Sequence, residues 1–213
     1  MAEQEGVIKY CLNFKPEGAE CSSHDLFLLN ECRSILKSRH LIGQDPERYD
    51  SYSYGNISIR CSERHGFVIS GTQTGKQNVL SGDHIAYVSE IDAPANTLSA
   101  IGNIEPSSEA MTHGVLYQVS DEINAVIHVH SPDIWRNCDA LGLPATERDI
   151  PYGTPQMANA VTGISLSLLK SNCLPIIFAM KGHEDGIVSV GQTLGDCTDL
   201  ILHYLHRSQD LES

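Results

Sequence analysis

The segment NAVIHVH at residues 124–130 carries the strongest structural signal in the chain. Its length and its run of apolar residues predict a buried strand. Side chains alternate across a strand with a period of two, so His128 and His130 leave the same face a short distance apart. Two imidazoles placed in this way can bind one metal ion, and a hydrogen-bonded pair of histidines at a strand end accounts for the same pattern.

A third ligand is needed because a catalytic zinc site usually has three protein ligands and one position for water or substrate. The best candidate is His183, which lies in a glycine-bounded turn between two apolar segments. Taken alone, a turn histidine without a ligand role explains His183 better. The other seven histidines lie on predicted helices or loops and are expected to have no partners; they are at positions 24, 40, 65, 84, 113, 203 and 206.

Glu109 opens a predicted helix directly after Ser107 and Ser108. An acidic residue in the first turn complements the helix dipole, which is a common structural role. The start of a helix with two serines is also suited to bind an anion, which would leave the glutamate facing the metal. Similar small polar residues occur in YGNIS (54–58) and SGTQTGK (70–76), where they predict either an anion-binding loop or ordinary turns.

The composition is that of a globular protein, with 41% hydrophobic and 19% charged residues among 213. This length predicts one domain over residues 1–213. A net charge of −13 argues against nucleic-acid or acidic-membrane partners. The chain shows no signal-peptide pattern or membrane-spanning apolar run, and its seven cysteines include no CxxC pair. We therefore expect a soluble cytoplasmic protein with reduced thiols.

Helices and strands alternate only in part along the sequence. The predicted helices cover residues 25–36, 109–119, 155–170 and 193–207, with another opening at Pro132. The predicted strands cover residues 7–14, 56–60, 66–70, 84–89, 124–130, 174–180 and 187–190. This order favours a three-layer α/β (αβα) domain whose central sheet is mixed, mostly antiparallel and flanked by helices.

Six motifs, taken in order, resemble those of the class II aldolase/adducin family. They are GNISIR (55–60), FVISGTQTGK (67–76), PSSEAMTH (106–113), AVIHVHS (125–131), PYGT (151–154) and GHEDGIVSVG (182–191). The resemblance covers about residues 25–208. It implies a nine-stranded, largely antiparallel sheet between helical layers, and a homotetramer with a zinc site near each subunit interface.

The resemblance also implies roles for particular residues. His128, His130 and His183 match the family's metal ligands, and Glu109 matches the glutamate that abstracts and returns a proton. The positions that hold the substrate phosphate match Asn56, Thr72, Gln73, Ser107 and Ser108, with Gln73 where the family usually has glycine. Two departures stand out: Glu184-Asp185 follow His183 where the family has glycine, and the aldolases' proton-donor tyrosine has no counterpart, for which Tyr152 is the candidate substitute.

The function implied by the resemblance is that of a zinc-dependent aldolase-type lyase. It would act on a small phosphorylated ketose or sugar acid through a metal-stabilised enediolate, with zinc or another divalent transition metal. A dehydratase of the methylthioribulose-phosphate type and a sugar-acid phosphate decarboxylase remain open, whereas the 4-epimerases carry aspartate where Glu109 stands. A non-catalytic module like the adducin head is the alternative of another class, and the intact histidines and Glu109 argue against it.

Overall fold

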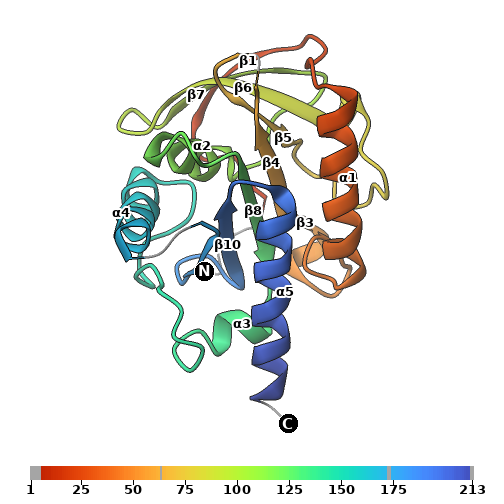
Figure 1. Cartoon of the computed structure of the whole chain (residues 1–213). Helices are drawn as coiled ribbons and strands as arrows, with labels where there is room; N and C mark the ends of the chain where they lie inside the picture. The colour runs from red at the N-terminus through yellow and green to blue at the C-terminus, as the bar shows by residue number, and fades with distance from the viewer. Residues whose placement is uncertain (1–5, 63, 172–173, 212–213) are drawn as a thin grey trace.

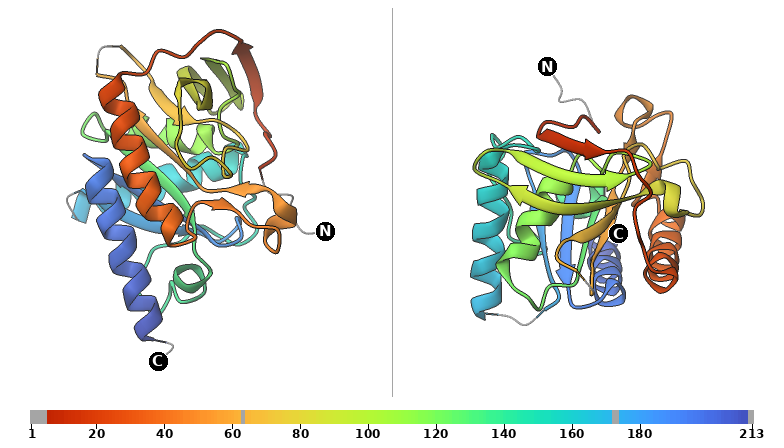
Figure 2. Two further views of the ribbon diagram at one scale, coloured as in Figure 1. Left: turned by 90° about the vertical axis from the view of Figure 1, so that its right-hand side faces the viewer. Right: turned by 90° about the horizontal axis from the view of Figure 1, so that it is seen from above.

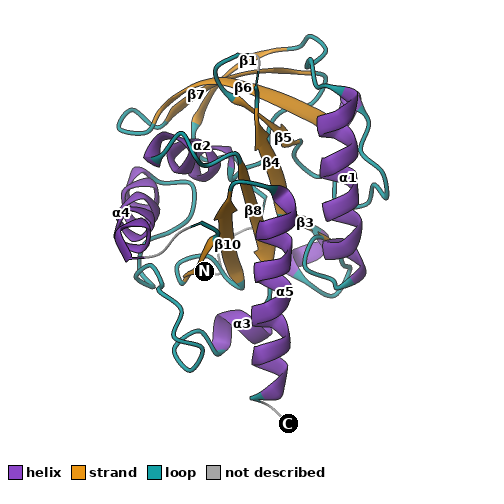
Figure 3. Cartoon of the chain, in the orientation of Figure 1, coloured by secondary structure: helices purple, strands orange, loops and turns teal. Residues whose placement is uncertain are grey.

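A computed structural model describes residues 6–62, 64–171 and 174–211 (Figures 1 and 3). Its described part contains an eight-stranded sheet with strand order β1-β7-β6-β5-β4-β8-β10-β9. The strands are β1 (Cys11–Lys15), β4 (Asn56–Arg60), β5 (Phe67–Ser70), β6 (Ile85–Asp92), β7 (Thr97–Gly102), β8 (Ala125–His130), β9 (Ile176–Met180) and β10 (Gly186–Gly191). β1 runs parallel to β7 and the other neighbours pair antiparallel. The mixed, mostly antiparallel sheet is thus confirmed.

The strand count differs from the nine implied by the resemblance. In the described residues, β2 (Gly43–Gln44) and β3 (Ser53–Tyr54) form a separate two-stranded pair instead of joining the large sheet. Two short 3₁₀ helices, η1 (Tyr49–Ser51) and η2 (Gly82–His84), lie in the loops. The strands β2 and β3 flank η1 in the chain. Residues 43–54 therefore form a small lobe beside the end of β8, as Figure 1 shows.

Helices cover both faces of the sheet, which confirms the three-layer αβα prediction (Figure 2). One face carries α1 (Ser23–Ser38), α3 (Pro132–Arg136) and α5 (Leu194–Asp210). The other carries α2 (Ala110–Val119) and α4 (Pro155–Ser171). Serine and threonine caps begin α1 and α5, because Ser22 Oγ and Thr193 Oγ1 accept hydrogen bonds from first-turn amides. No helix in the described ranges is both long and apolar enough to cross a bilayer.

Strand β8 separates the two hydrophobic cores. Ala125, Ile127 and Val129 are fully buried in the core beneath α1, α3 and α5. The alternate residue Val126 is buried in the core beneath α2 and α4. Because side chains alternate, the rings of His128 and His130 leave β8 on the α2 and α4 side. The predicted two-sided burial of this strand is correct.

Two strand predictions need correction. The first strand begins at Cys11 and not at Val7, because residues 6–10 lie outside the sheet and contact Tyr152 and Ser107 instead. Strand β7 was not predicted, although the alternating burial of its residues 97–102 is typical of a strand with one buried face. Without β7, the sheet would lack the neighbour that pairs with both β1 and β6.

Candidate metal centre

Three histidines meet at one end of the sheet. His128 and His130 end β8, and His183 lies in the turn between β9 and β10. In the antiparallel register His130 lies opposite Gly186, which brings this turn beside the end of β8. The turn needs glycine at position 182, where a Cβ atom would come 1.7 Å from the carbonyl oxygen of Ile150. The conformation of this turn therefore places the His183 side chain beside those of His128 and His130.

The spacing of the three rings fits a metal ion. Each ring offers a nitrogen, and these atoms all lie within 4.8 Å of one another. The Nε2 atoms of His128 and His130 are 3.1 Å apart. Tetrahedral zinc with bonds of about 2.0–2.1 Å would set its ligands about 3.3 Å apart, close to this distance. A hydrogen-bonded pair accounts for two rings only, so the third ring favours the metal interpretation.

The cluster is also electrostatically suited to a cation. The side chains of His128 and His130 are fully buried, and His183 is 2% exposed. Burial is the main cause that holds the pKa of His130 well below its usual value, and His183 and Arg48 contribute in the same direction. A neutral imidazole is the form that binds a metal ion. Three neutral nitrogen donors suit zinc, and they also suit copper, iron and nickel.

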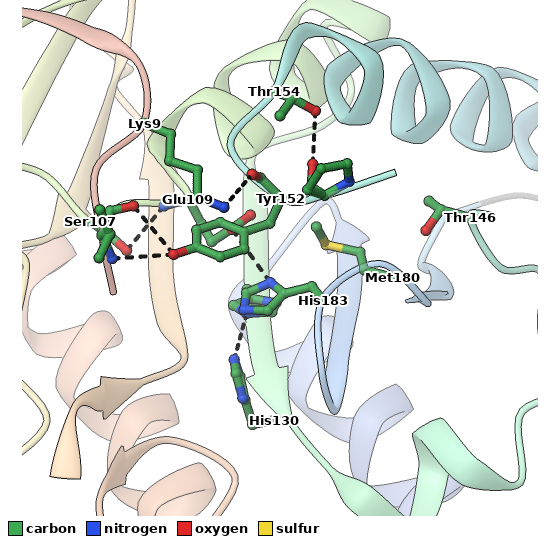
Figure 4. Close-up of polar contacts among 12 residues, drawn as sticks. Lys9, Ser107, Glu109, His130, Thr146, Tyr152, Thr154, Met180 and His183 are labelled. Atoms are coloured by element: carbon green, nitrogen blue, oxygen red, sulfur yellow. Dashed lines mark hydrogen bonds and ion pairs between the residues drawn. The ribbon is translucent and has the colours of Figure 1, made fainter. Parts of the chain in front are cut away.

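Glu109 lies beside this cluster and is buried. It directly precedes α2, and its Oε1 atom is 3.4 Å from Nδ1 of His183. The side chain has no solvent exposure, so it does not act as a solvated acid at a helix end. Of the two arrangements considered for Glu109, the structure has the one in which the carboxylate lies beside the histidine cluster (Figure 4).

A small polar pocket lies next to Glu109. All five residues predicted to hold phosphate line it, namely Asn56, Thr72, Gln73, Ser107 and Ser108. The remaining lining residues are small or polar: Gly6, Ser53, Gly55, Gly71, Thr74 and Gly75. Hydroxyl, amide and backbone N–H groups of this kind can cup an anion without a lysine or arginine. The structure thus brings together loops that are far apart in the sequence.

Helix α1 holds the loop 71–77 through hydrogen bonds from Arg33. The buried guanidinium of Arg33 donates to the carbonyl oxygens of Thr74, at 2.7 Å, and Gln77, at 2.5 Å. Gln73 has a positive φ of 54°, a conformation that glycine adopts at the lowest cost. Its Oε1 accepts a hydrogen bond from the Ser53 amide at 3.0 Å, which ties the loop to β3. This left-handed backbone accounts for the glycine that the resemblance implies at position 73.

A polar group around His130 was missed from the sequence. The Tyr49 ring meets His130 edge-on, with centroids 4.7 Å apart. Its hydroxyl donates to Asp185 Oδ2 and accepts from Arg48 Nη2, both at 2.6 Å. Asp185 is one of the two residues at which the turn after His183 departs from the family motif. It accepts the hydrogen bond of Tyr49, and Tyr49 in turn contacts His130. Three successive positive φ values at residues 49–51 build the turn, and no local sequence pattern signals them.

Tyr152 also reaches the cluster, in an orientation that the sequence did not indicate. Its ring stacks on that of His183, with centroids 4.5 Å apart and planes inclined by 21°. Its hydroxyl accepts a hydrogen bond from the Val7 amide at 3.2 Å and points away from the three histidines (Figure 4). The geometry therefore gives no support to Tyr152 as a substitute proton donor.

The fold and the site define the class of this protein. The family profile described as Class II Aldolase and Adducin N-terminal domain matches residues 45–206. The chain belongs to the class II aldolase/adducin family, whose known members include aldolases and dehydratases.

Among its relatives, L-fuculose phosphate aldolase of Methanococcus maripaludis is 30% identical over 177 residues, which cover 76% of this chain and 82% of that protein. Methylthioribulose-1-phosphate dehydratase of Leptospira interrogans is 34% identical over 80 residues, covering 36% of this chain and only 32% of the dehydratase. The solved L-fuculose-1-phosphate aldolase of Thermus thermophilus aligns with a TM-score of 0.62 at 18% identity, covering 87% of this chain and 91% of that one. A sugar-phosphate aldolase of Thermotoga maritima gives 0.63 at 14% identity, covering 89% and 95%. The structural likenesses establish the shared fold.

Proposed function

We propose that this protein is a zinc-dependent aldolase-type lyase acting on a small phosphorylated ketose or sugar acid. One observation carries the proposal: the three histidines, Glu109 and the polar pocket meet at one end of the sheet. The cluster gives a place for the carbonyl end of a substrate, and the pocket gives one for its phosphate. Glu109 lies between them, where a proton would be removed.

The residues present fit a divalent ion in both chemistry and spacing. His128, His130 and His183 would hold it, and their three nitrogens would leave a fourth position for substrate. When bound, the ion would supply Lewis-acid stabilisation for negative charge that develops on the substrate's oxygens. Zinc is our choice because three imidazoles and an open position are typical of catalytic zinc.

The chain's own groups account for positioning and proton transfer. Ser107, Ser108 and Thr72 would donate hydroxyl hydrogen bonds to the phosphate, and Asn56 would donate from its amide. Glu109 would accept a proton from the substrate through a carboxylate oxygen and return it in the reverse direction. Because this carboxylate is buried, bulk water would not compete for that proton.

A second candidate is dehydration of the methylthioribulose-phosphate type. It is favoured by the partial match to the Leptospira dehydratase and uses the same proton abstraction next to a carbonyl. A non-catalytic module like the adducin head is less well supported, because it would have no use for three converged histidines and a buried glutamate. We further propose that residues 1–213 form one domain of a cytoplasmic homotetramer with no nucleic-acid or membrane partner.

The test is a screen of phosphorylated ketoses and sugar acids with zinc-loaded protein and product identification by mass spectrometry. Aldol cleavage would give two carbonyl fragments, dehydration would give one product lighter by a water, and decarboxylation would release carbon dioxide. The same protein stripped of metal is the matched control, and its activity should return when zinc is restored. Equal turnover before and after stripping would contradict the proposal. The oligomeric state can be measured on the same sample by light scattering.

A further inference from the structure

We propose that Tyr152 is a positioning residue for His183 and that the N-terminal segment, residues 6–10, holds Tyr152 in place. This inference rests on the metal-ligand role proposed for His183. Among the three histidines, His183 is the one carried by a turn, whereas His128 and His130 are fixed by the pairing of β8 with β4 and β10. Its ring therefore depends more on its neighbours for orientation.

The first face of the Tyr152 ring lies on His183. The two rings are nearly parallel, at 21°, and their centroids are 4.5 Å apart. Tyr152 is 1% exposed and His183 is 2% exposed, so the contact excludes water. A stack of this kind fixes the plane of the imidazole. The same His183 ring also stacks on His128, with centroids 4.8 Å apart and planes inclined by 26°, and it lies nearly perpendicular to His130, at 86°.

The second face of the ring carries a cation from the N-terminal segment. The ammonium of Lys9 lies 3.6 Å from the Tyr152 ring centroid, and it donates to the Tyr152 carbonyl oxygen at 3.2 Å. The Lys9 stem lies against Gly153, where an added Cβ would come 3.0 Å from the Cβ of Lys9. The ring is thus sandwiched between a cation and the proposed metal ligand.

Further contacts fix the same segment at three points. The Val7 amide donates to the Tyr152 hydroxyl at 3.2 Å, and the Tyr10 hydroxyl donates to the Ser107 carbonyl oxygen at 2.9 Å. Gly6 lines the polar pocket next to Gln73. These contacts hold residues 6–10 against Tyr152, Ser107 and Gln73 instead of against the sheet, and Figure 4 shows Lys9 on the Tyr152 ring.

The experiment measures cobalt binding to the metal-free, full-length protein by visible absorption, because the spectrum reports the arrangement of the ligands around the ion. Tyr152→Leu removes the aromatic stack and Tyr152→Phe keeps it. Lys9→Met removes the cation and keeps the stem. Lys15→Met is the matched control, since Lys15 is an exposed lysine on β1 that pairs with Glu17. Thermal unfolding of each metal-free variant is measured in parallel.

We expect Tyr152→Leu to weaken cobalt binding by about 10- to 100-fold and to alter the spectrum. Lys9→Met should weaken it by about threefold. Tyr152→Phe keeps the stack and loses the hydrogen bond from Val7, so it should weaken binding less than Tyr152→Leu. Lys15→Met should resemble the wild type. If Tyr152→Leu fails to fold, Lys9→Met carries the test, and unchanged binding in that variant would overturn the inference.

A folded Tyr152→Leu variant with the wild-type spectrum and affinity would overturn the positioning role alone. Absence of cobalt binding by the wild type would overturn both this inference and the proposed metal-dependent function. The two failures are therefore distinguishable.

Discussion

Glu109 and His113 stand one helical turn apart and show two different uses of buried polar groups. Both face the sheet from the start of α2, and both are at most 1% exposed. Glu109 meets the histidine cluster, whereas Nδ1 of His113 lies 2.7 Å from Ser58 Oγ. That hydroxyl lies 2.7 Å from the Tyr117 hydroxyl, which extends the hydrogen-bonded chain. Burial of a histidine therefore does not identify a functional site; convergence of several donors does.

The comparison also corrects the expectation that the remaining histidines lack partners. His113 has Ser58, His84 lies 3.0 Å from Ser81 Oγ, and His206 Nδ1 is 3.1 Å from Asp210. These partners are single groups, and in the described residues His128, His130 and His183 are the group in which three ligand-type side chains converge.

The largest expected effect is the loss of metal from His183→Ala. With two of three ligands left, zinc content should fall from about one ion per chain to near zero after dialysis, and activity should vanish with it. His113→Gln is the matched control, because it removes an equally buried imidazole and should keep its zinc. Elemental analysis decides the matter, and retention of a full zinc complement by His183→Ala would show that this ring is not a ligand.

Glu109→Gln should separate metal binding from chemistry. The amide keeps the volume of the side chain but cannot accept a proton, so turnover should fall by about 100- to 10,000-fold with zinc content unchanged. The measurement is kcat on the substrate found in the screen, alongside elemental analysis. Wild-type kcat in this variant would remove Glu109 from the proton-transfer role.

His113 should make stability depend on pH. Burial lowers its pKa to about 3 from the ordinary 6.5, so below the ordinary value the unfolded chain takes up a proton that the folded chain does not. The contribution of His113 to the free energy of unfolding is therefore fully present above about pH 6.5. It falls by about 1.4 kcal/mol per pH unit as the pH drops toward the pKa of His113 in the folded protein.

Urea unfolding between about pH 6 and pH 4 measures this slope, and His113→Gln should lower it by about one proton's contribution. His206→Gln is the control, since the His206 side chain is 78% exposed. Identical slopes in wild type and His113→Gln would mean that His113 is protonated in the folded protein.

A smaller effect on substrate binding is expected from Arg33, which does not line the polar pocket but bonds to the loop that does. Arg33→Met removes the two hydrogen bonds that Arg33 donates to loop 71–77, so KM for a phosphorylated substrate should rise by about tenfold while kcat stays nearly unchanged. Arg39→Met, an exposed arginine just beyond α1, is the control. An unchanged KM in Arg33→Met would show that the loop holds its shape without Arg33.

The sequence predicts the parts of this molecule that depend on local pattern. The histidine strand, the helix start just after Glu109 and the polar loops around Asn56 and Thr72 all have short, regular signals, and the structure brings them together as expected. The roles of these residues stay predictions.

Long-range contacts could not be predicted. The stack of Tyr152 on His183 joins a loop to a distant turn, and the bond between Tyr49 and Asp185 spans 136 residues. The departure of residues 6–10 from the edge strand depends on contacts with Tyr152 and Ser107, which no periodicity in the segment itself reveals. Tertiary contacts override local propensity at these places.

X-ray absorption at the zinc edge of the zinc-loaded protein tests the central claim most directly, because it counts imidazole ligands and measures their bond lengths. We predict three imidazole nitrogens at about 2.0–2.1 Å, with an oxygen ligand completing the shell. In His183→Ala the imidazole count should fall to two if any zinc remains. A wild-type spectrum with fewer than three imidazoles, or with sulfur in the first shell, would contradict the account.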